Sequence, residues 1–176
     1  MMNKVLCSLL LFLSISCGLQ GRNANYARDS KRIWLDSKEI HHGEYVWKMK
    51  KAGDVISSAE KVSTLGYDTS DWLSAIVPGT VLNSLVYNKE YPEPYYGVNN
   101  KLESGKIPDI SKVGREFYTY WFRTEFDVPE SFAGKTIWLQ PDGVNYRAEI
   151  WVNGNLLSTL NGMFISDYIN VTDFVK

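Results

Sequence analysis

Residues 117–128 read FYTYWFRTEFDV, and their side chains alternate with a period of two. One face carries Tyr118, Tyr120, Phe122, Phe126 and Val128, and the other carries Thr119, Arg123, Glu125 and Asp127. Successive side chains of a β-strand point to opposite faces, so this pattern is typical of a strand with one buried face. We therefore expect a strand on the wall of an apolar core, with Glu125 facing solvent.

Other segments carry strand and turn signals. Residues 45–49 again alternate, and place Tyr45, Trp47 and Met49 on one face. Asn153-Gly154 separates two apolar runs and suits a type I′ turn, because both of its residues accept positive φ angles. Short strands without long intervening helices favour an antiparallel β-sandwich, so the predicted fold class is all-β.

One short helix is expected within this sandwich. Val81, Leu82, Leu85 and Val86 have helical spacing, and Thr80 is placed to cap the N-terminus. A helix of this length needs packing on the sheets for its stability. The polar stretch 51–70, which precedes it, is expected to form a long excursion between strands.

The first 17 residues have the pattern of an export signal. Lys4 precedes an apolar run, Val5 to Ile15, that is too short to span a bilayer as a helix. Ser16-Cys17-Gly18 resembles a bacterial lipobox, in which Cys17 is lipidated and becomes the mature N-terminus. The alternative is an ordinary signal peptide cut a few residues later. Either way the chain is expected to be exported by a bacterium, to the periplasm or as an outer-membrane lipoprotein.

The remaining chain divides into a flexible tether, residues 18–32, and a folded domain, residues 33–176. The tether is polar and lacks periodicity. Both cysteines, Cys7 and Cys17, lie inside the export signal, so the mature fold is expected to contain no disulfide.

Charge and histidine content narrow the function classes. Nineteen basic and 20 acidic residues give a net charge of −1, which offers no electrostatic reason to expect nucleic acid or a membrane surface as partner. Membrane contact is expected only through the lipid anchor. His41 and His42 are the only histidines, and adjacent strand residues point to opposite faces. We therefore expect no metal site, no cofactor and no histidine-based catalytic triad.

Aromatic residues are abundant, with 6 Trp and 11 Tyr. Most tryptophans lie in strand-like runs and suit a core. Tyr95 and Tyr96 differ, because the sequence YPEPYYGVNN around them, residues 91–100, is poor in both helix and strand signals. Aromatic rings beside asparagine amides are a common way to bind sugars, so this segment is either a sugar-recognition loop or a stiff connection.

Four segments together resemble a known family. They are WLSAIVPGTVLNSLVYNKEYPEPYYGVNN, REFYTYWFRTEFDVP, DGVNYRAEIWVNG and GMFISDYINVTDFV. In this order they closely resemble the N-terminal domain of glycoside hydrolase family 2 enzymes. The pattern is most similar to the branch containing exo-β-glucosaminidases and endo-β-mannosidases.

The resemblance implies a jelly-roll sandwich of the galactose-binding type, the sugar-binding domain of that family. In complete members a (β/α)₈ barrel of roughly 250 residues carries the two catalytic glutamates, and the acid/base glutamate follows an asparagine. This sequence contains no Asn-Glu pair. The resemblance therefore implies no catalytic residue in this chain, and whether the chain by itself is an enzyme stays open.

The resemblance also implies substrate-binding residues. Asn99, with Asn100 as the alternative, occupies the place where relatives contact the terminal sugar, and Tyr95 and Tyr96 precede it. Gly97 stands where β-mannosidases often have arginine, which leaves the sugar open. The expected partners are a β-linked carbohydrate and the downstream domains of an intact glycosidase.

Three functions remain open from the sequence. The first is an accessory, sugar-binding domain of a β-glycosidase of the β-mannoside or β-glucosaminide type, as a fragment without catalysis of its own. The second is a free-standing exported carbohydrate-binding module tethered through Cys17. The third is a structural domain whose exposed aromatic residues form an interdomain face.

Overall fold

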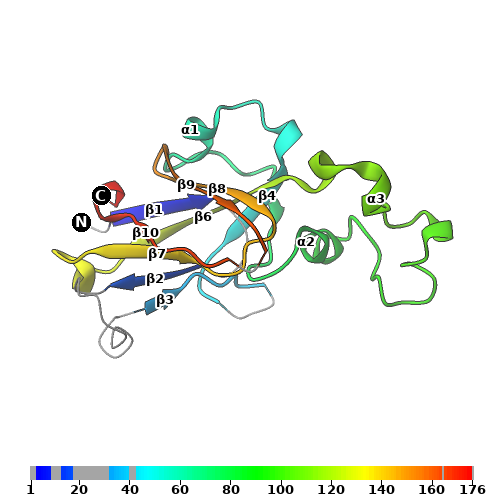
Figure 1. Cartoon of the computed structure of the whole chain (residues 1–176), viewed down its shortest axis with the longest axis horizontal. Helices are drawn as coiled ribbons and strands as arrows, with labels where there is room; N and C mark the ends of the chain where they lie inside the picture. The colour runs from blue at the N-terminus through cyan, green and yellow to red at the C-terminus, as the bar shows by residue number, and fades with distance from the viewer. Residues whose placement is uncertain (1–2, 9–12, 18–31, 40–42, 164, 176) are drawn as a thin grey trace.

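A computed structural model describes residues 3–8, 13–17, 32–39, 43–163 and 165–175. Two antiparallel sheets form the body of the molecule within these residues (Figure 1). In spatial order, sheet A contains β5 (Leu73–Ser74), β4 (Trp47–Lys51), β6 (Tyr120–Val128), β1 (Asn3–Ser8), β8 (Arg147–Val152) and β9 (Asn155–Asn161). Sheet B contains β10 (Ile169–Asn170), β7 (Ile137–Pro141), β2 (Leu13–Cys17) and β3 (Arg32–Trp34). The prediction of an all-β antiparallel sandwich is confirmed.

The helical elements are short. The α-helices are α1 (Ala59–Val62), α2 (Val81–Tyr87) and α3 (Ile110–Val113). The 3₁₀ turns are η1 (Ala52–Asp54), η2 (Leu102–Ser104), η3 (Arg115–Tyr118), η4 (Glu130–Phe132) and η5 (Thr172–Phe174). No helix among the described ranges is long and apolar enough to cross a bilayer.

Helix α2 is the helix that the sequence predicts, and its cap is confirmed. The Thr80 hydroxyl accepts a hydrogen bond from the Asn83 amide at 3.0 Å, and Val81 and Leu85 are buried. The expectation of a single helix is incomplete, because α1 and α3 are also present. Each has four residues, which is too short for a period of 3.6 to become visible in a sequence.

The core lies between the two sheets and follows the alternation of their strands. Trp47 and Met49 of β4 are completely buried, while Lys48 and Lys50, which alternate with them, lie on the outer face of sheet A. The Trp47 indole donates a hydrogen bond to the Leu35 carbonyl at 2.6 Å, so the one polar atom of this buried ring is satisfied. The largest fully buried side chains are Trp47, Phe122, Phe132, Leu35, Met49, Ile76, Leu139 and Ile150.

Strand β6 begins later than the sequence suggests. Residues up to Tyr118 belong to η3, and the strand starts at Tyr120. The inner face of β6 is as expected, with Phe122, Phe126 and Val128 in the core. Its outer face differs from the expectation, because Arg123 and Glu125 are covered by another segment, as described for the candidate site below.

The hairpin between β8 and β9 is confirmed. Asn153 and Gly154 both have positive φ angles, 47° and 85°, and Val152 pairs with Asn155 across the turn. A type I′ turn needs positive φ at both central residues, which is why this dipeptide specifies the hairpin. The Gly154 amide also donates to the Ser63 carbonyl at 3.1 Å, so the turn is tied to the end of α1.

The predicted export signal contributes two strands to the whole-chain structure. Strand β1 lies between β6 and β8, and β2 lies between β7 and β3. Cleavage is a matter of processing, so the export signal stays a prediction. The predicted tether falls mostly outside the described residues, except that Arg32 is the first residue of β3, and His41 and His42 also fall outside them.

A long segment leaves the sandwich after α2. Figure 1 shows residues 88–118, in green, extending beyond α2 and away from the two sheets. The residues around Asn99 belong to this extension. The fold therefore presents the predicted sugar-recognition segment at one end of the molecule.

Candidate functional site

The base of the extension is a group of three tyrosines. Tyr91, Tyr118 and Tyr120 are partly buried and pack against the apolar core. Burial raises the pKa of each phenol above its ordinary value, and the neighbouring Tyr91 adds to the rise at Tyr118 and Tyr120. Tyr91 thus attaches the segment to the sandwich.

Residues 91–106, which we call the aromatic loop, continue from this base in successive tight turns. The amides of Tyr96, Asn99 and Lys101 donate to carbonyls three residues earlier, at distances of 3.0 to 3.2 Å. Gly97 has φ = 59° and open space around it, a left-handed conformation that glycine adopts without strain. The loop then passes through η2 and ends at Lys106.

Asn99 is the hydrogen-bonding centre of the aromatic loop. Only 6% of its surface is exposed. Its Nδ2 donates to the Glu93 carbonyl at 2.9 Å, and its Oδ1 accepts from the Lys106 ammonium at 2.9 Å. The Asn99 carbonyl accepts from the Ser104 hydroxyl at 3.2 Å. Asn99 therefore joins the start of the loop to its end.

The other three predicted site residues face outward. Tyr95 and Tyr96 are 94% and 77% exposed, and Asn100 is also exposed. Val98 and Leu102 add apolar surface nearby in the sequence. The structure thus brings the four predicted residues into one loop but separates their roles. Their contact with a sugar stays a prediction.

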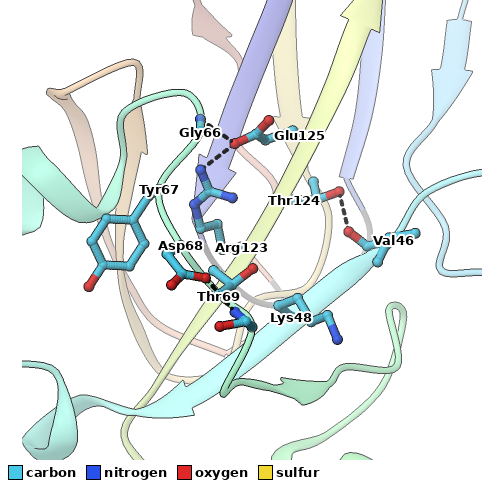
Figure 2. Close-up of a pocket in the computed structure, with 10 residues that line it drawn as sticks. Val46, Lys48, Gly66, Tyr67, Asp68, Thr69, Arg123, Thr124 and Glu125 are labelled. Carbon is cyan, nitrogen blue, oxygen red and sulfur yellow. Dashed lines mark hydrogen bonds and ion pairs between the residues drawn. The ribbon is translucent and has the colours of Figure 1, made fainter.

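A pocket that the sequence did not suggest lies on the outer face of sheet A. Its volume is about 410 Å³. Figure 2 shows Lys48 of β4 and Arg123, Thr124 and Glu125 of β6 beneath the segment that contains Tyr67. The complete lining is Val46, Lys48, Gly66, Tyr67, Asp68, Thr69, Ser70, Arg123, Thr124 and Glu125.

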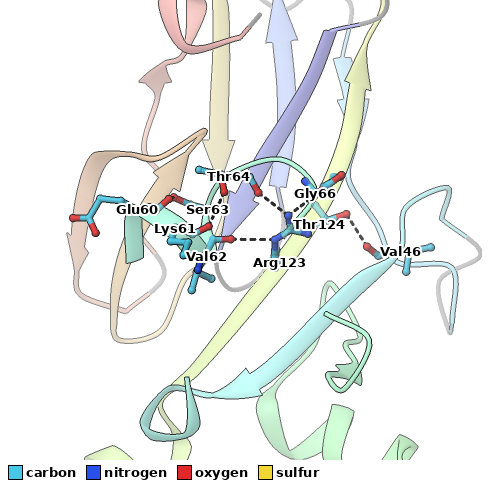
Figure 3. A network of polar contacts seen from close by, with 10 residues as sticks. Val46, Glu60, Lys61, Val62, Ser63, Thr64, Gly66, Arg123 and Thr124 are labelled. Atoms are coloured by element: carbon cyan, nitrogen blue, oxygen red, sulfur yellow. Dashed lines mark hydrogen bonds and ion pairs between the residues drawn. The ribbon is translucent and has the colours of Figure 1, made fainter. Parts of the chain in front are cut away.

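Arg123 forms the floor of this pocket and is only 5% exposed. Its Nε donates to the Val62 carbonyl at 3.1 Å and its Nη2 to the Thr64 carbonyl at 2.8 Å, as Figure 3 shows. Nη2 also forms an ion pair with Glu125. Glu125 is expected from the sequence to face solvent, but it is half-buried in this pocket beside the buried Arg123, because the segment that contains Gly66 folds back over this face of the sheet.

In the described ranges, no group of three or more His, Cys, Asp and Glu side chains is arranged to hold a metal ion.

We expect Asn99→Ala to loosen the aromatic loop and Asn100→Ala to leave it intact. The first variant removes two side-chain hydrogen bonds, one of them to a charged group, whereas the Asn100 side chain is exposed. The loss should raise hydrogen exchange of the amides of residues 99–105 by about tenfold or more. Equal exchange in the two variants, measured by mass spectrometry, would contradict this role for Asn99.

Alkaline pH should destabilise the folded chain through the three tyrosines at the foot of the extension. Because their folded pKa values are raised, Tyr91, Tyr118 and Tyr120 keep their protons in the folded state where the unfolded chain has lost them. Their contribution is complete below the unfolded pKa of about 10 and is lost as pH rises through the higher folded values. Urea unfolding from about pH 8 upward measures the decline.

Two variants test whether these tyrosines cause the fall in the free energy of unfolding at alkaline pH. Tyr120→Phe should flatten the fall in the free energy of unfolding with pH, since it removes one of the titrating phenols. Tyr95→Phe is the matched control and should leave the slope unchanged, because Tyr95 is exposed. The assignment is wrong if Tyr120→Phe and the unmodified chain decline in parallel.

Comparison with known proteins identifies the domain type. Residues 47–176 match the family described as glycosyl hydrolase 2 galactose-binding domain-like. A mannosylglycoprotein endo-beta-mannosidase of Lilium longiflorum is 39% identical over 107 residues, which are 61% of this chain and 11% of the relative. An exo-beta-D-glucosaminidase of Amycolatopsis orientalis is 27% identical over 120 residues, 66% of this chain and 11% of the relative.

A beta-mannosidase B of Aspergillus terreus is 32% identical over 127 residues, 72% of this chain and 13% of the relative. No solved structure matches the chain. The chain thus spans only about a tenth of the length of these relatives. The resemblance seen in the sequence is confirmed, and since the family match covers well over half of the chain, the chain belongs to the galactose-binding domain-like family of glycosyl hydrolase 2.

Proposed function

We propose that the chain is the N-terminal accessory domain of a β-glycosidase that acts on β-mannosides or β-glucosaminides. The observation that carries this proposal is the aromatic loop, which presents Tyr95, Tyr96 and Asn100 to solvent at one end of a domain of this family. Support for the substrate class comes from the relatives, which include an endo-beta-mannosidase and an exo-beta-D-glucosaminidase.

The aromatic loop has the chemistry to contact a sugar. Exposed tyrosine rings offer flat apolar faces to sugar C–H groups, and asparagine offers both donors and acceptors to hydroxyls. Asn99 spends one Nδ2 hydrogen and one Oδ1 lone pair on the loop. The second Nδ2 hydrogen and the second Oδ1 lone pair of Asn99 remain available to a ligand, so Asn99 can support the loop and also bind a sugar. The amide of the exposed Asn100 can form all of its hydrogen bonds with the sugar.

Catalysis would come from another part of the same polypeptide. Hydrolysis of a glycosidic bond requires two carboxyl groups about 5 to 9.5 Å apart on either side of the bond. The aromatic loop offers Glu93 and Glu103, and the Glu93 carboxylate accepts a hydrogen bond from the Tyr95 amide at 3.3 Å. In the proposed enzyme the loop serves as one wall of a substrate pocket, and downstream domains supply the remainder.

The test is to isolate the native polypeptide with an antibody raised against this chain. We expect a product larger than 20.1 kDa that hydrolyses p-nitrophenyl β-D-mannopyranoside or the corresponding β-D-glucosaminide. Asn100→Ala should raise KM about two- to tenfold, the effect of one lost hydrogen bond. Leu156→Ala, on the exposed edge strand β9, is the control and should leave KM unchanged.

Two results would overturn the proposal. One is a native product no larger than 20.1 kDa without activity. The other is a larger product that hydrolyses neither glycoside.

A free-standing exported carbohydrate-binding module is the second candidate. The pocket on sheet A favours it, because that pocket is lined by Val46, Lys48 and residues 66–70 and 123–125 of this domain alone. This candidate predicts sugar binding by the 176-residue chain alone.

We further propose that the chain is exported and that Cys17 is lipidated. The proposal rests on the basic start, the short apolar run and the Ser-Cys-Gly sequence. Expressed in a Gram-negative host, the mature protein should begin at Cys17 and carry a lipid mass. Cys17→Ser should abolish the lipid, and Cys7→Ser, the matched control, should not.

Intact-mass measurement separates the outcomes. An unlipidated N-terminus a few residues beyond Cys17 would support ordinary export and contradict the lipid anchor. Retention of the N-terminal 17 residues would contradict both.

A further inference from the structure

The pocket on sheet A is a built feature and not a chance gap between loops. Arg123 fixes its floor through Val62 and Thr64, and Glu125 accepts the Gly66 amide at 2.8 Å. Three hydrogen bonds, two donated by Arg123 and one accepted by Glu125, thus join strand β6 to the segment that covers it. The pocket wall is held in place before any ligand arrives, which reduces the ordering cost of binding.

The rim of the pocket is also held in a defined position. The Tyr67 ring lies 5.8 Å from the Arg123 guanidinium carbon and meets Trp72 edge-on at 6.0 Å. Ser70 donates its amide to the Asp68 carboxylate at 2.9 Å, and these contacts with Ser70 hold the pKa of Asp68 below its usual range. Figure 2 shows Asp68 and Thr69 above the outer face of the sheet.

The charges that line the pocket balance. Lys48 and Arg123 contribute two positive charges, and Asp68 and Glu125 contribute two negative ones. The Arg123 donors are largely committed to two carbonyls and to Glu125. The pocket therefore lacks the net positive field and the free guanidinium fork that phosphate or carboxylate ligands prefer.

What the pocket does offer is a mixture of donors and acceptors beside apolar surface. Lys48 lies at the opening, and within the described residues no hydrogen bond or ion pair engages its ammonium group. Thr69, Ser70 and Asp68 add hydroxyl and carboxylate groups, while Val46 and the Tyr67 ring add apolar area. Neutral polyols, whose hydroxyls donate and accept around a C–H face, match this lining.

We propose that this pocket is a second carbohydrate site, which binds one or two neutral hexose units of a β-linked oligosaccharide. Its volume of about 410 Å³ lies at the small end of the range of ligand pockets. The site is separate from the aromatic loop and does not depend on the proposed glycosidase activity. In a longer enzyme it would hold a polymeric substrate near the domain, and in a free-standing module it would be the binding site itself.

The experiment is a titration of the full 176-residue chain with mannobiose and N,N′-diacetylchitobiose, followed by amide chemical shifts. At least one of the two sugars should shift the amides of residues 66–70, with a dissociation constant on the order of 1 mM. Lys48→Ala should weaken binding about tenfold or more, as expected for a hydrogen bond from a charged donor. Digalacturonate should bind more weakly than the neutral sugar.

Lys50→Ala is the matched control. Lys50 follows Lys48 on the same face of β4, but it is paired with Asp71 at 2.5 Å and does not line the pocket. This variant should bind the sugar like the unmodified chain. If Lys48→Ala proves unfolded by circular dichroism, Thr69→Ala replaces it and should also weaken binding.

Three results would overturn the proposal. They are the absence of shifts at residues 66–70 at about ten times the expected dissociation constant, equal or tighter binding of digalacturonate, and equal loss of affinity in the Lys50 and Lys48 variants. Shifts confined to residues 93–106 are a case of the first result, and they would support the aromatic loop as the sugar site. Failure here is thus distinguishable from failure of the proposed glycosidase function.

Discussion

The arrangement of this domain depends on the alternation of strand β6. Its inner face places Phe122 and Phe126 in the core, and its outer face places Arg123 and Glu125 under residues 51–72. Removing a guanidinium from water costs several kcal/mol unless its donors are satisfied. Here two carbonyls and a carboxylate satisfy them, so the covering segment and the strand are specified together. The pocket exists because the covering segment is hydrogen-bonded to Arg123 through the Val62 and Thr64 carbonyls.

Local patterns in the sequence were sufficient for strand β4, the inner face of strand β6, the β8–β9 hairpin and helix α2. The alternation in β4 and the Asn153-Gly154 turn depend on neighbouring residues only, and both are found as expected. The burial of Arg123 could not be predicted from local patterns, because its hydrogen-bond partner Val62 lies 61 residues away in the sequence. Alternation identifies the two faces of a strand, but it does not reveal that another segment covers the polar one.

The same distinction applies within the aromatic loop. Resemblance to a family located the loop and its four candidate residues, since the motif is contiguous in sequence. It did not indicate that Asn99 points inward, because that orientation depends on Glu93 and Lys106 on either side. A family motif therefore indicates candidate residues, whereas the structural role of each one depends on contacts that the motif does not specify.

The apolar pattern near the N-terminus is compatible with two different outcomes, an export signal and a pair of strands. An apolar run suits the central part of an export signal, and it also suits a strand between two others, which is how β1 and β2 occur here. The two outcomes exclude one another in a processed chain, because removal of these residues would leave β6 paired only with β4, and β7 only with β10. Unpaired strand edges readily accept another strand. Export would therefore require another strand, or a covering segment, at both positions, and this requirement links the processing of the chain to the completeness of its sheets.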